Sequence, residues 1–240
     1  MDDKRAETVV YEEHVGSSRP YWRDIILGLN DGLVSVFLLV AGVVGGGLDR
    51  SDVLITGIAG ALAGALSMAA GEYLATKSQE QVLDSELALE RKHIAHFRQS
   101  EVDQLYDYFR EMGVAEDDLE TVVAACSRND QTLLKAMKVL EFGVVDDERR
   151  SPVRAMLMSG ILFFIGAIPP IVPFFADVSP GQALIWSAIL STSALFAVGV
   201  MKTRVTRTNP LASGFENLLI AALGGVAAWL IGRLVGSSLA

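Results

Sequence analysis

The sequence predicts an all-α integral membrane protein, with five transmembrane helices and a helical domain inserted between helices 2 and 3. Three observations support this fold class. The 240 residues are 51% hydrophobic, with a mean hydropathy of +0.37, which is high for a soluble domain. The apolar residues gather in runs of about 20, the length that a helix needs to cross the hydrocarbon core. Between Ser78 and Ser151, however, 17 acidic residues stand against 9 basic ones.

These properties divide the chain into an N-terminal tail (1–20), transmembrane helices 1 and 2 (21–77), an acidic helical domain (78–151) and transmembrane helices 3 to 5 (152–240). The net charge of −9 lies mostly in the acidic domain, which excludes nucleic acid as a partner and favours cations. Cys126 is the single cysteine, so an internal disulfide and a cysteine-based zinc site are excluded.

The first predicted span, from Tyr21 to Gly47, carries acidic residues on an apolar helix. Asp24, Gly28, Asp31 and Ser35 follow a four-three-four spacing, which places them on one stripe. A charge at membrane depth costs a few kcal/mol or more, so Asp31 is a functional candidate. Asp24 lies nearer the interface and is interpreted as a helix-start carboxylate.

A single long helix is predicted from Val53 to Phe97, because no proline interrupts it. Its forty-odd residues would extend about 65 Å, twice the thickness of the hydrocarbon core. Gly60, Gly64, Met68 and Glu72 recur every fourth residue on its apolar half. The glycines allow close helix packing, whereas a thioether beside a carboxylate favours a transition metal over magnesium or calcium. Met68 taken alone is more typical of a packed core than of a metal site.

The polar half of the same helix places Glu86, Glu90 and His93 on one face. Glu-x-x-His is the spacing that helical di-iron carboxylate proteins use, but a single copy does not complete such a site within one chain. Three short amphipathic helices follow, and Glu101 and Glu141 lie near their ends, where they can converge with the first face. A solvated acidic surface is the alternative interpretation.

Three further spans close the chain, and Pro169, Pro170 and Pro173 are expected to kink or end the first of them. Glu216 near the start of the last span is a secondary candidate for an ion path, with interface solvation as the alternative. The predicted spans are Val153 to Phe175, Gln182 to Met201 and Leu211 to Val235.

The distribution of basic residues predicts the orientation. Lys202, Arg204 and Arg207 are assigned to the loop after the fourth span, whereas the loop from Ala176 to Gly181 has no Lys or Arg. The amino terminus and the acidic domain are therefore expected in the cytoplasm, and the carboxy terminus on the opposite side. The short tails favour a bacterial plasma membrane over a vacuolar membrane.

Two segments, RDIILGLNDGLVSVFLLVAG (Arg23 to Gly42) and AGALAGALSMAAGEYLATKSQEQ (Ala59 to Gln81), are followed by ELALERKHI and later by LEFGV. Together they resemble the vacuolar iron transporter family of iron(II) and manganese(II) transporters. The resemblance implies a homodimer of five-helix protomers, with a metal path between the subunits and a cytoplasmic metal-binding domain. It also implies antiport, in which divalent metal leaves the cytosol as protons enter.

Residue by residue, Asp31 matches the aspartate of the path on the first helix, and Met68 matches the methionine on the second. The resemblance also implies metal ligands in the acidic domain, at Glu90, Glu101, Met137 and Glu141.

Several positions depart from the plant pattern. His93 and Gln104 stand where plant members have glutamate, Lys138 stands where they have a second methionine, and Gly60 replaces an acid. Histidine still binds iron or manganese, whereas a neutral amide is a weak donor and an ammonium group repels a cation. We therefore expect fewer or weaker sites in this domain than in the plant proteins.

The predicted function is export of iron(II) or manganese(II) coupled to protons, with zinc(II) and cobalt(II) as further cations that this ligand set accepts. No other cofactor and no enzymatic activity are expected. Metal captured in the acidic domain would pass to a membrane path of Asp31, Met68 and Glu72, with Glu216 as the secondary candidate. The capturing residues would include Glu86 and His93 as well as the ligands above. A membrane-tethered ferroxidase built from Glu90 and His93 of two chains and a metal sensor are the alternatives.

Overall fold

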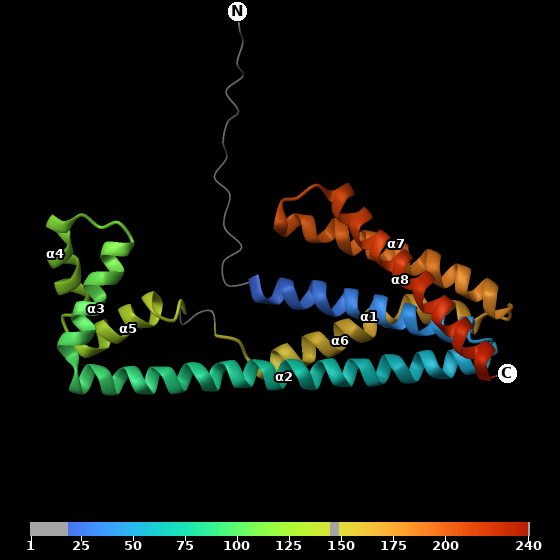
Figure 1. Cartoon of the computed structure of the whole chain (residues 1–240), viewed down its shortest axis with the longest axis horizontal. Coiled ribbons are helices and arrows are strands. Elements are labelled where there is room, and N and C mark those ends of the chain that lie inside the picture. The colour runs from blue at the N-terminus through green and yellow to red at the C-terminus, as the bar shows by residue number, and fades with distance from the viewer. Residues whose placement is uncertain (1–18, 145–148, 240) are drawn as a thin grey trace, which may run out of the picture. The chain divides into compact units, whose positions relative to one another are not determined.

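The computed structural model describes residues 19–144 and 149–239. These residues form helices, with no strand among them, which confirms the predicted all-α fold. The elements are α1 (Arg19–Gly45), α2 (Arg50–His96), α3 (Arg98–Glu111), α4 (Glu116–Cys126), α5 (Asp130–Leu140), α6 (Pro152–Ile171), the 3₁₀ helix η3 (Val172–Phe175), α7 (Pro180–Thr206) and α8 (Pro210–Leu239) (Figure 1). Most of the predicted N-terminal tail, residues 1–18, lies outside the described residues.

Five helical segments within the described residues are long and apolar enough to cross a membrane: α1, α2, α6 with η3, α7 and α8. The predicted number of candidate spans is therefore confirmed. The 47 residues of α2 form one helix, as predicted. At 1.5 Å per residue it extends about 70 Å, which is more than twice the thickness of the hydrocarbon core. Only part of α2 can lie in a membrane.

The chain divides into two compact units, each described by itself. The first combines the chain up to Ala61 with the chain from Leu162 onward, so it holds α1, the start of α2, the end of α6, η3, α7 and α8. The second, Leu62–Ile161, holds the rest of α2, α3 to α5 and the start of α6. The predicted acidic domain, 78–151, falls inside the second unit, and its boundaries stay a prediction.

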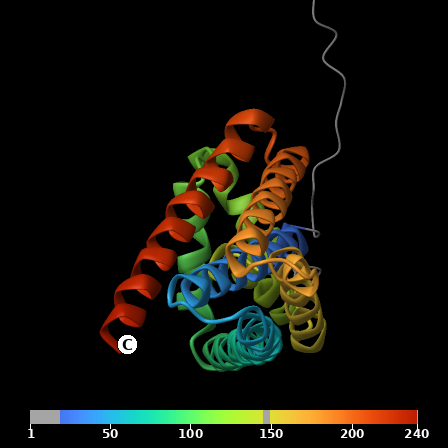
Figure 2. The ribbon, with the colours of Figure 1, turned by 90° about the vertical axis from the view of Figure 1, so that its right-hand side faces the viewer.

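In the first unit, α7 and α8 lie side by side and both pack against α1 (Figure 2). Glycines allow the backbones of α1 and α8 to touch. A methyl group added at Gly232 would overlap the carbonyl oxygen of Gly42. Small residues at a helix crossing allow this approach in a membrane, where dispersion contacts replace the hydrophobic effect. The buried core between α1, α7 and α8 comprises Leu33, Leu195, Val198 and Ala221.

The helix α6 contains Pro169 and Pro170 in its last turn and gives way to the 3₁₀ helix η3, so the predicted end at the prolines is confirmed. The buried Ser187 hydroxyl on α7 donates to the Pro170 carbonyl oxygen at 2.8 Å. This bond satisfies a helix-end carbonyl that would otherwise be buried without a donor.

The helix α7 is longer than predicted. It continues past the expected end at Met201 to Thr206, so Lys202 and Arg204 lie on the helix and their assignment to a loop was wrong. No glycine or proline follows Met201 until Pro210, so nothing in the sequence stops the helix earlier. It ends where Arg207 adopts a left-handed conformation with φ of 54°.

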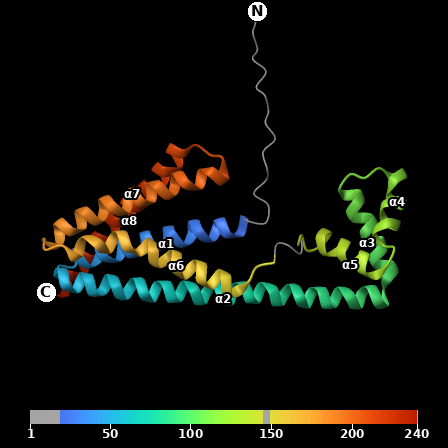
Figure 3. The ribbon, with the colours of Figure 1, turned by 180° about the vertical axis from the view of Figure 1, so that it is seen from behind.

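In the second unit, α3, α4 and α5 gather beside the C-terminal end of α2 (Figures 1 and 3). Each short helix buries one apolar stripe, as its sequence period predicts. Their common core comprises Ile94, Leu105, Val123, Leu133 and Met137. The helix α3 stops at the predicted glycine, since Gly113 has a φ of +88° that side-chain-bearing residues rarely adopt. The four helices thus form a small domain with its own core.

Candidate metal-binding site

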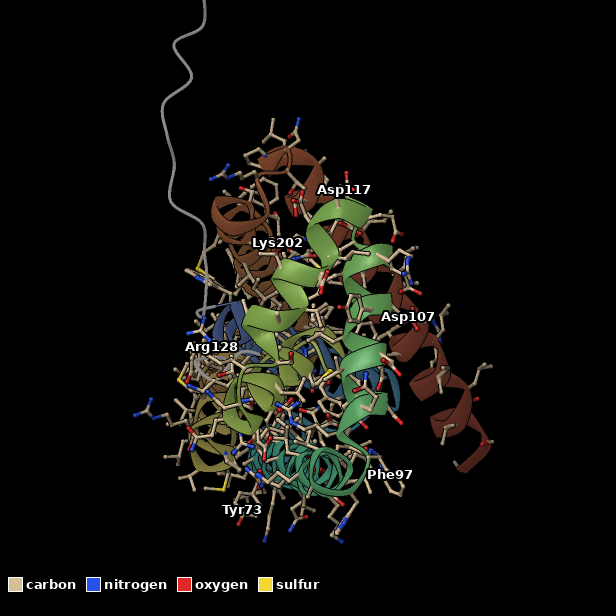
Figure 4. All side chains as sticks on the ribbon, turned by 90° about the vertical axis from the view of Figure 1, so that its left-hand side faces the viewer. Tyr73, Phe97, Asp107, Asp117, Arg128 and Lys202 are labelled. Carbon is tan, nitrogen blue, oxygen red and sulfur yellow. The ribbon has the colours of Figure 1, made fainter. Side chains whose placement is uncertain are left out.

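Glu90, His93 and Glu101 converge where α2 meets α3. Glu90 and His93 lie one turn apart near the end of α2, and Glu101 lies in the first turn of α3. The chain bends between the two helices at Phe97, which Figure 4 labels. His93 Nδ1 lies 3.8 Å from Glu90 Oε2 and 3.5 Å from Glu101 Oε1.

The three potential ligand atoms all lie within 4.8 Å of one another. Ligands placed about 2.1 Å from one metal ion lie roughly 3 to 4 Å apart, so small side-chain rotations would gather all three around a single cation. Two carboxylates and an imidazole suit iron(II), manganese(II), cobalt(II) or zinc(II) better than magnesium or calcium, which prefer oxygen alone.

The two carboxylates of the cluster are buried, whereas the imidazole is more exposed. Glu90 is 3% exposed and Glu101 is 6% exposed, whereas the His93 side chain is 42% exposed. Glu90 Oε1 and Glu101 Oε2 have no hydrogen-bond partner among the described residues. Burying such groups is costly unless a cation or a donor compensates. The arrangement is therefore one that a bound cation would stabilise.

The pKa of Glu90 is raised from 4.5 to about 7. Burial is the largest cause, followed by the negative charges of Glu101 and Glu141 and by a hydrogen bond with the Glu101 carboxyl group. Both burial and a like charge favour the neutral acid. Near neutral pH, Glu90 therefore exchanges a proton within a site whose geometry also suits a metal ion.

Two further predicted acids belong to the same electrostatic neighbourhood. The pKa of Glu141, at the C-terminal end of α5, is raised first by desolvation and then by Glu101, while His93 lowers it and Glu86 raises it. Glu86 and Glu141 are both exposed. They surround the buried cluster with negative charge, which attracts a hydrated cation from solvent.

The domain contains three further positions that the sequence analysis discussed as ligands: Met137, Gln104 and Lys138. Met137 is fully buried in the hydrophobic core, so its role as a ligand stays a prediction. Gln104 Nε2 donates to the Tyr108 hydroxyl oxygen at 2.9 Å. Lys138 is also buried, at 7% exposure. Among the described His, Cys, Asp and Glu residues, Glu90, His93 and Glu101 form the one group of three whose potential ligand atoms lie close enough to hold a metal ion.

The polar stripe on α1 divides into a buried and an exposed part. Asp24 is 0% exposed, although the sequence suggested a helix-start carboxylate at the interface. Asp31 and Ser35 are exposed, and the Ser35 hydroxyl donates to Asp31 Oδ1 at 2.8 Å. Sequence reasoning placed Ser35 on the stripe without giving it a role, and the spacing of four residues was the signal for this contact.

The other membrane candidates belong to different parts of the structure. Met68 and Glu72 are half-buried on α2 in the second unit, whereas Asp31 belongs to the first, so their convergence stays a prediction. Glu216 lies 3.6 Å, through Oε2, from Lys202 Nζ. This partner was missed because Lys202 was assigned to a loop. The predicted place of Glu216 in the ion path is not tested by this pair.

Comparisons with known proteins agree with these observations. The model of the VIT family matches residues 22–233. The chain is similar to "Vacuolar iron transporter 1" of Tulipa gesneriana, 31% identical over 95% of this chain and 92% of the relative. It is similar to "Vacuolar iron transporter 1" of Arabidopsis thaliana, 32% identical over 89% and 85%. "Protein CCC1" of Saccharomyces cerevisiae is 28% identical over 89% and 68%. These plant and yeast relatives give no support to the predicted bacterial plasma membrane.

Proposed function

The chain belongs to the VIT family, and on that premise we propose that it exports iron(II) or manganese(II) from the cytosol in exchange for protons. The observation that carries the proposal is the convergence of Glu90 and His93 on α2 with Glu101 on α3. The helix α2 is also one of the helices long and apolar enough to cross a membrane. The name of the plant relatives refers to iron, and the ligand set accepts manganese equally well.

Metal capture is the proposed role of the acidic domain. Glu86 and Glu141 attract the hydrated cation, and Glu90, His93 and Glu101 replace its water ligands. The ligands must lose their protons to bind metal, so the raised pKa of Glu90 makes capture and proton binding compete. The domain is therefore expected to load metal at neutral pH and to release it on acidification.

Passage across the membrane is proposed to begin at Asp31. This carboxylate is exposed on the surface of a membrane-spanning helix, where contact with lipid would cost several kcal/mol. Its face must therefore be covered by water or by other protein. A second copy of the chain covering this face would create a polar path between two protomers, and Met68 and Glu72 would supply further ligands. A homodimer is the corresponding proposal.

Proton coupling follows from the same carboxylates. An aspartate that binds a divalent cation when ionised releases it when protonated, so opposite gradients of metal and protons can exchange at one site. The proposed orientation puts the acidic domain and the amino terminus in the cytoplasm, because the basic residues Arg149 and Arg150 precede α6 and Arg154 lies in its first turn.

The decisive experiment measures uptake of manganese(II) and iron(II) into proteoliposomes with and without a proton gradient. We compare wild type with Asp31→Asn and with Asp177→Asn, which removes the same charge from an exposed loop where Asp177 pairs with Arg50. The gradient should accelerate uptake by wild type and by the Asp177 variant, but not by the Asp31 variant. Equal gradient-dependent transport by wild type and Asp31→Asn refutes the proposed path.

The alternatives give different results in the same preparation. A ferroxidase would consume oxygen in fixed proportion to iron(II), even without transport. Among the described residues, only one group of three ligands is present, so a dinuclear centre would need a second chain. A sensor would bind metal at Glu90 and His93 without moving it across the membrane. Metal movement that needs Asp31 favours the transporter over both.

A further inference from the structure

The turn between α7 and α8 lies where lipid headgroups would surround the protein. Both helices are long and apolar enough to cross a membrane, so the few residues between Thr206 and Pro210 mark its surface. The side chain of Asn209 accepts hydrogen bonds from the backbone N–H groups of Leu211 at 3.0 Å and Ala212 at 3.2 Å. The N-terminal end of α8 is thus already capped by Asn209, and the dipole of this helix alone does not define a site.

A cavity of about 490 Å³ opens at this turn, and six of the seven residues that line it carry a polar or charged side chain. Three other cavities of the first unit are lined almost entirely by apolar side chains and glycines, which fit acyl chains or neighbouring helices. The polar cavity instead offers hydroxyl, amide and charged groups. Its lining comprises Lys202, Thr206, Thr208, Asn209, Ala212, Ser213 and Glu216.

Ser213 gives independent evidence for a ligand. It is 5% exposed, and its hydroxyl has no hydrogen-bond partner among the described residues. A buried hydroxyl without a partner is destabilising, so such groups in native proteins are normally satisfied by protein, water or a ligand. Ser213 lines the same cavity as Lys202, and both can donate to one anionic group.

The charges of the cavity have both signs. Lys202 Nζ lies 3.6 Å from Glu216 Oε2, and the side chains are 23% and 65% exposed respectively. An ion pair with this much exposure contributes little to stability, so a ligand can exchange partners with it at low cost. A ligand that carries a phosphate and an ammonium group would match both charges, whereas a plain anion would face the Glu216 carboxylate.

We propose that the cavity at the α7–α8 turn binds the phosphoethanolamine headgroup of a membrane lipid. Lys202 and Ser213 donate to the phosphate oxygens, and Glu216 accepts from the ammonium group. Phosphatidylcholine lacks an N–H to donate to Glu216, and phosphatidylglycerol lacks the cation. The proposal does not rest on the proposed metal path, and its test measures lipid binding and not transport.

The test uses the delipidated full-length protein in detergent and native mass spectrometry. Short-chain phosphatidylethanolamine, phosphatidylglycerol, phosphatidylcholine and free phosphoethanolamine are titrated separately. The variants are Lys202→Gln, Ser213→Ala and Glu216→Gln, and Lys77→Gln is the charge-matched control on α2. Thermal unfolding midpoints are recorded for each variant, because loss of fold would also remove binding.

Phosphatidylethanolamine should bind best to wild type and to the Lys77 control. Loss of the charged Lys202 donor should weaken its binding about tenfold. Glu216→Gln should remove the preference for phosphatidylethanolamine over phosphatidylglycerol. Ser213→Ala should weaken binding while leaving the unfolding midpoint of the lipid-free protein unchanged or higher, since it deletes an unsatisfied hydroxyl.

Three results would overturn the proposal. Equal binding of all three lipids by wild type would mean that the cavity selects no headgroup. Unchanged phosphatidylethanolamine binding by both Lys202→Gln and Ser213→Ala would place the lipid elsewhere. Binding of free phosphoethanolamine as tight as that of the lipid would identify a soluble ligand and contradict a membrane source.

Discussion

The metal affinity of the buried cluster should depend on pH because Glu90 must ionise before it binds a cation. Its pKa is raised to about 7 by burial and by the charges of Glu101 and Glu141. From this value, about 9% of Glu90 is ionised at pH 6 and about 91% at pH 8. Glu90 alone should therefore raise the apparent affinity about tenfold between these two pH values.

Manganese(II) is the suitable probe, because it resists oxidation by air and its free hydrated form is counted directly by electron paramagnetic resonance. Full-length protein in detergent is titrated at pH 6, 7 and 8 in buffers that do not bind metal. The test variant is Glu90→Gln, which keeps the size of the side chain and removes its ionisation. The control is Glu120→Gln, which removes one charge from an exposed position on α4.

Wild type and the Glu120 control should gain affinity steeply as the pH rises, whereas Glu90→Gln should bind weakly with a shallower dependence. The same pKa shift also makes the stability of the metal-free protein depend on pH. The folded state holds the Glu90 proton between pH 4.5 and about 7, where the unfolded state releases it, so stability falls as the pH rises through this window. A change in affinity below threefold from pH 6 to pH 8 would refute the assigned pKa.

Two further predictions concern packing. Leu105→Ala should lower the opening free energy of the α3–α5 domain by about 2 to 5 kcal/mol, measured by hydrogen exchange, because Leu105 is 0% exposed in the core. Leu89→Ala, at a position that is 46% exposed, is the control with little expected effect. Gly232→Ala should lower the thermal unfolding midpoint by forcing α8 away from Gly42, whereas Gly181→Ala, with nothing within 4 Å of its added methyl group, should not. Equal midpoints for the two glycine variants would contradict the close backbone contact.

The helices could be predicted from the sequence because their signals are local. The period of apolar residues, the absence of proline through α2 and the glycine after α3 each act within a few residues. The end of α7 was misplaced for the same reason. The run after Met201 contains polar and basic residues but no helix breaker, and polarity was taken for a loop although it does not stop a helix.

The buried cluster was only partly accessible to such reasoning. Glu90 and His93 share a face because they are three residues apart on one helix, which the sequence states directly. Glu101 joins them only because the chain bends at Phe97, and the direction of that bend depends on how α3 packs on the core of the domain. Glu86 shares the predicted face but stays exposed. Burial, and with it the raised pKa of Glu90, is a property of the packed domain.

The stripe on α1 illustrates how neighbours decide the role of each carboxylate. Asp24 and Asp31 are seven residues apart and so lie on nearly the same side of the helix, yet Asp24 is buried and Asp31 is exposed. The difference arises from what surrounds each level of α1, which periodicity does not encode. A buried carboxylate is enclosed by its own chain, whereas an exposed one on a membrane-spanning helix needs a polar surrounding from outside that chain. Of the two, Asp31 is therefore the residue that a second protomer, water or a passing cation can reach.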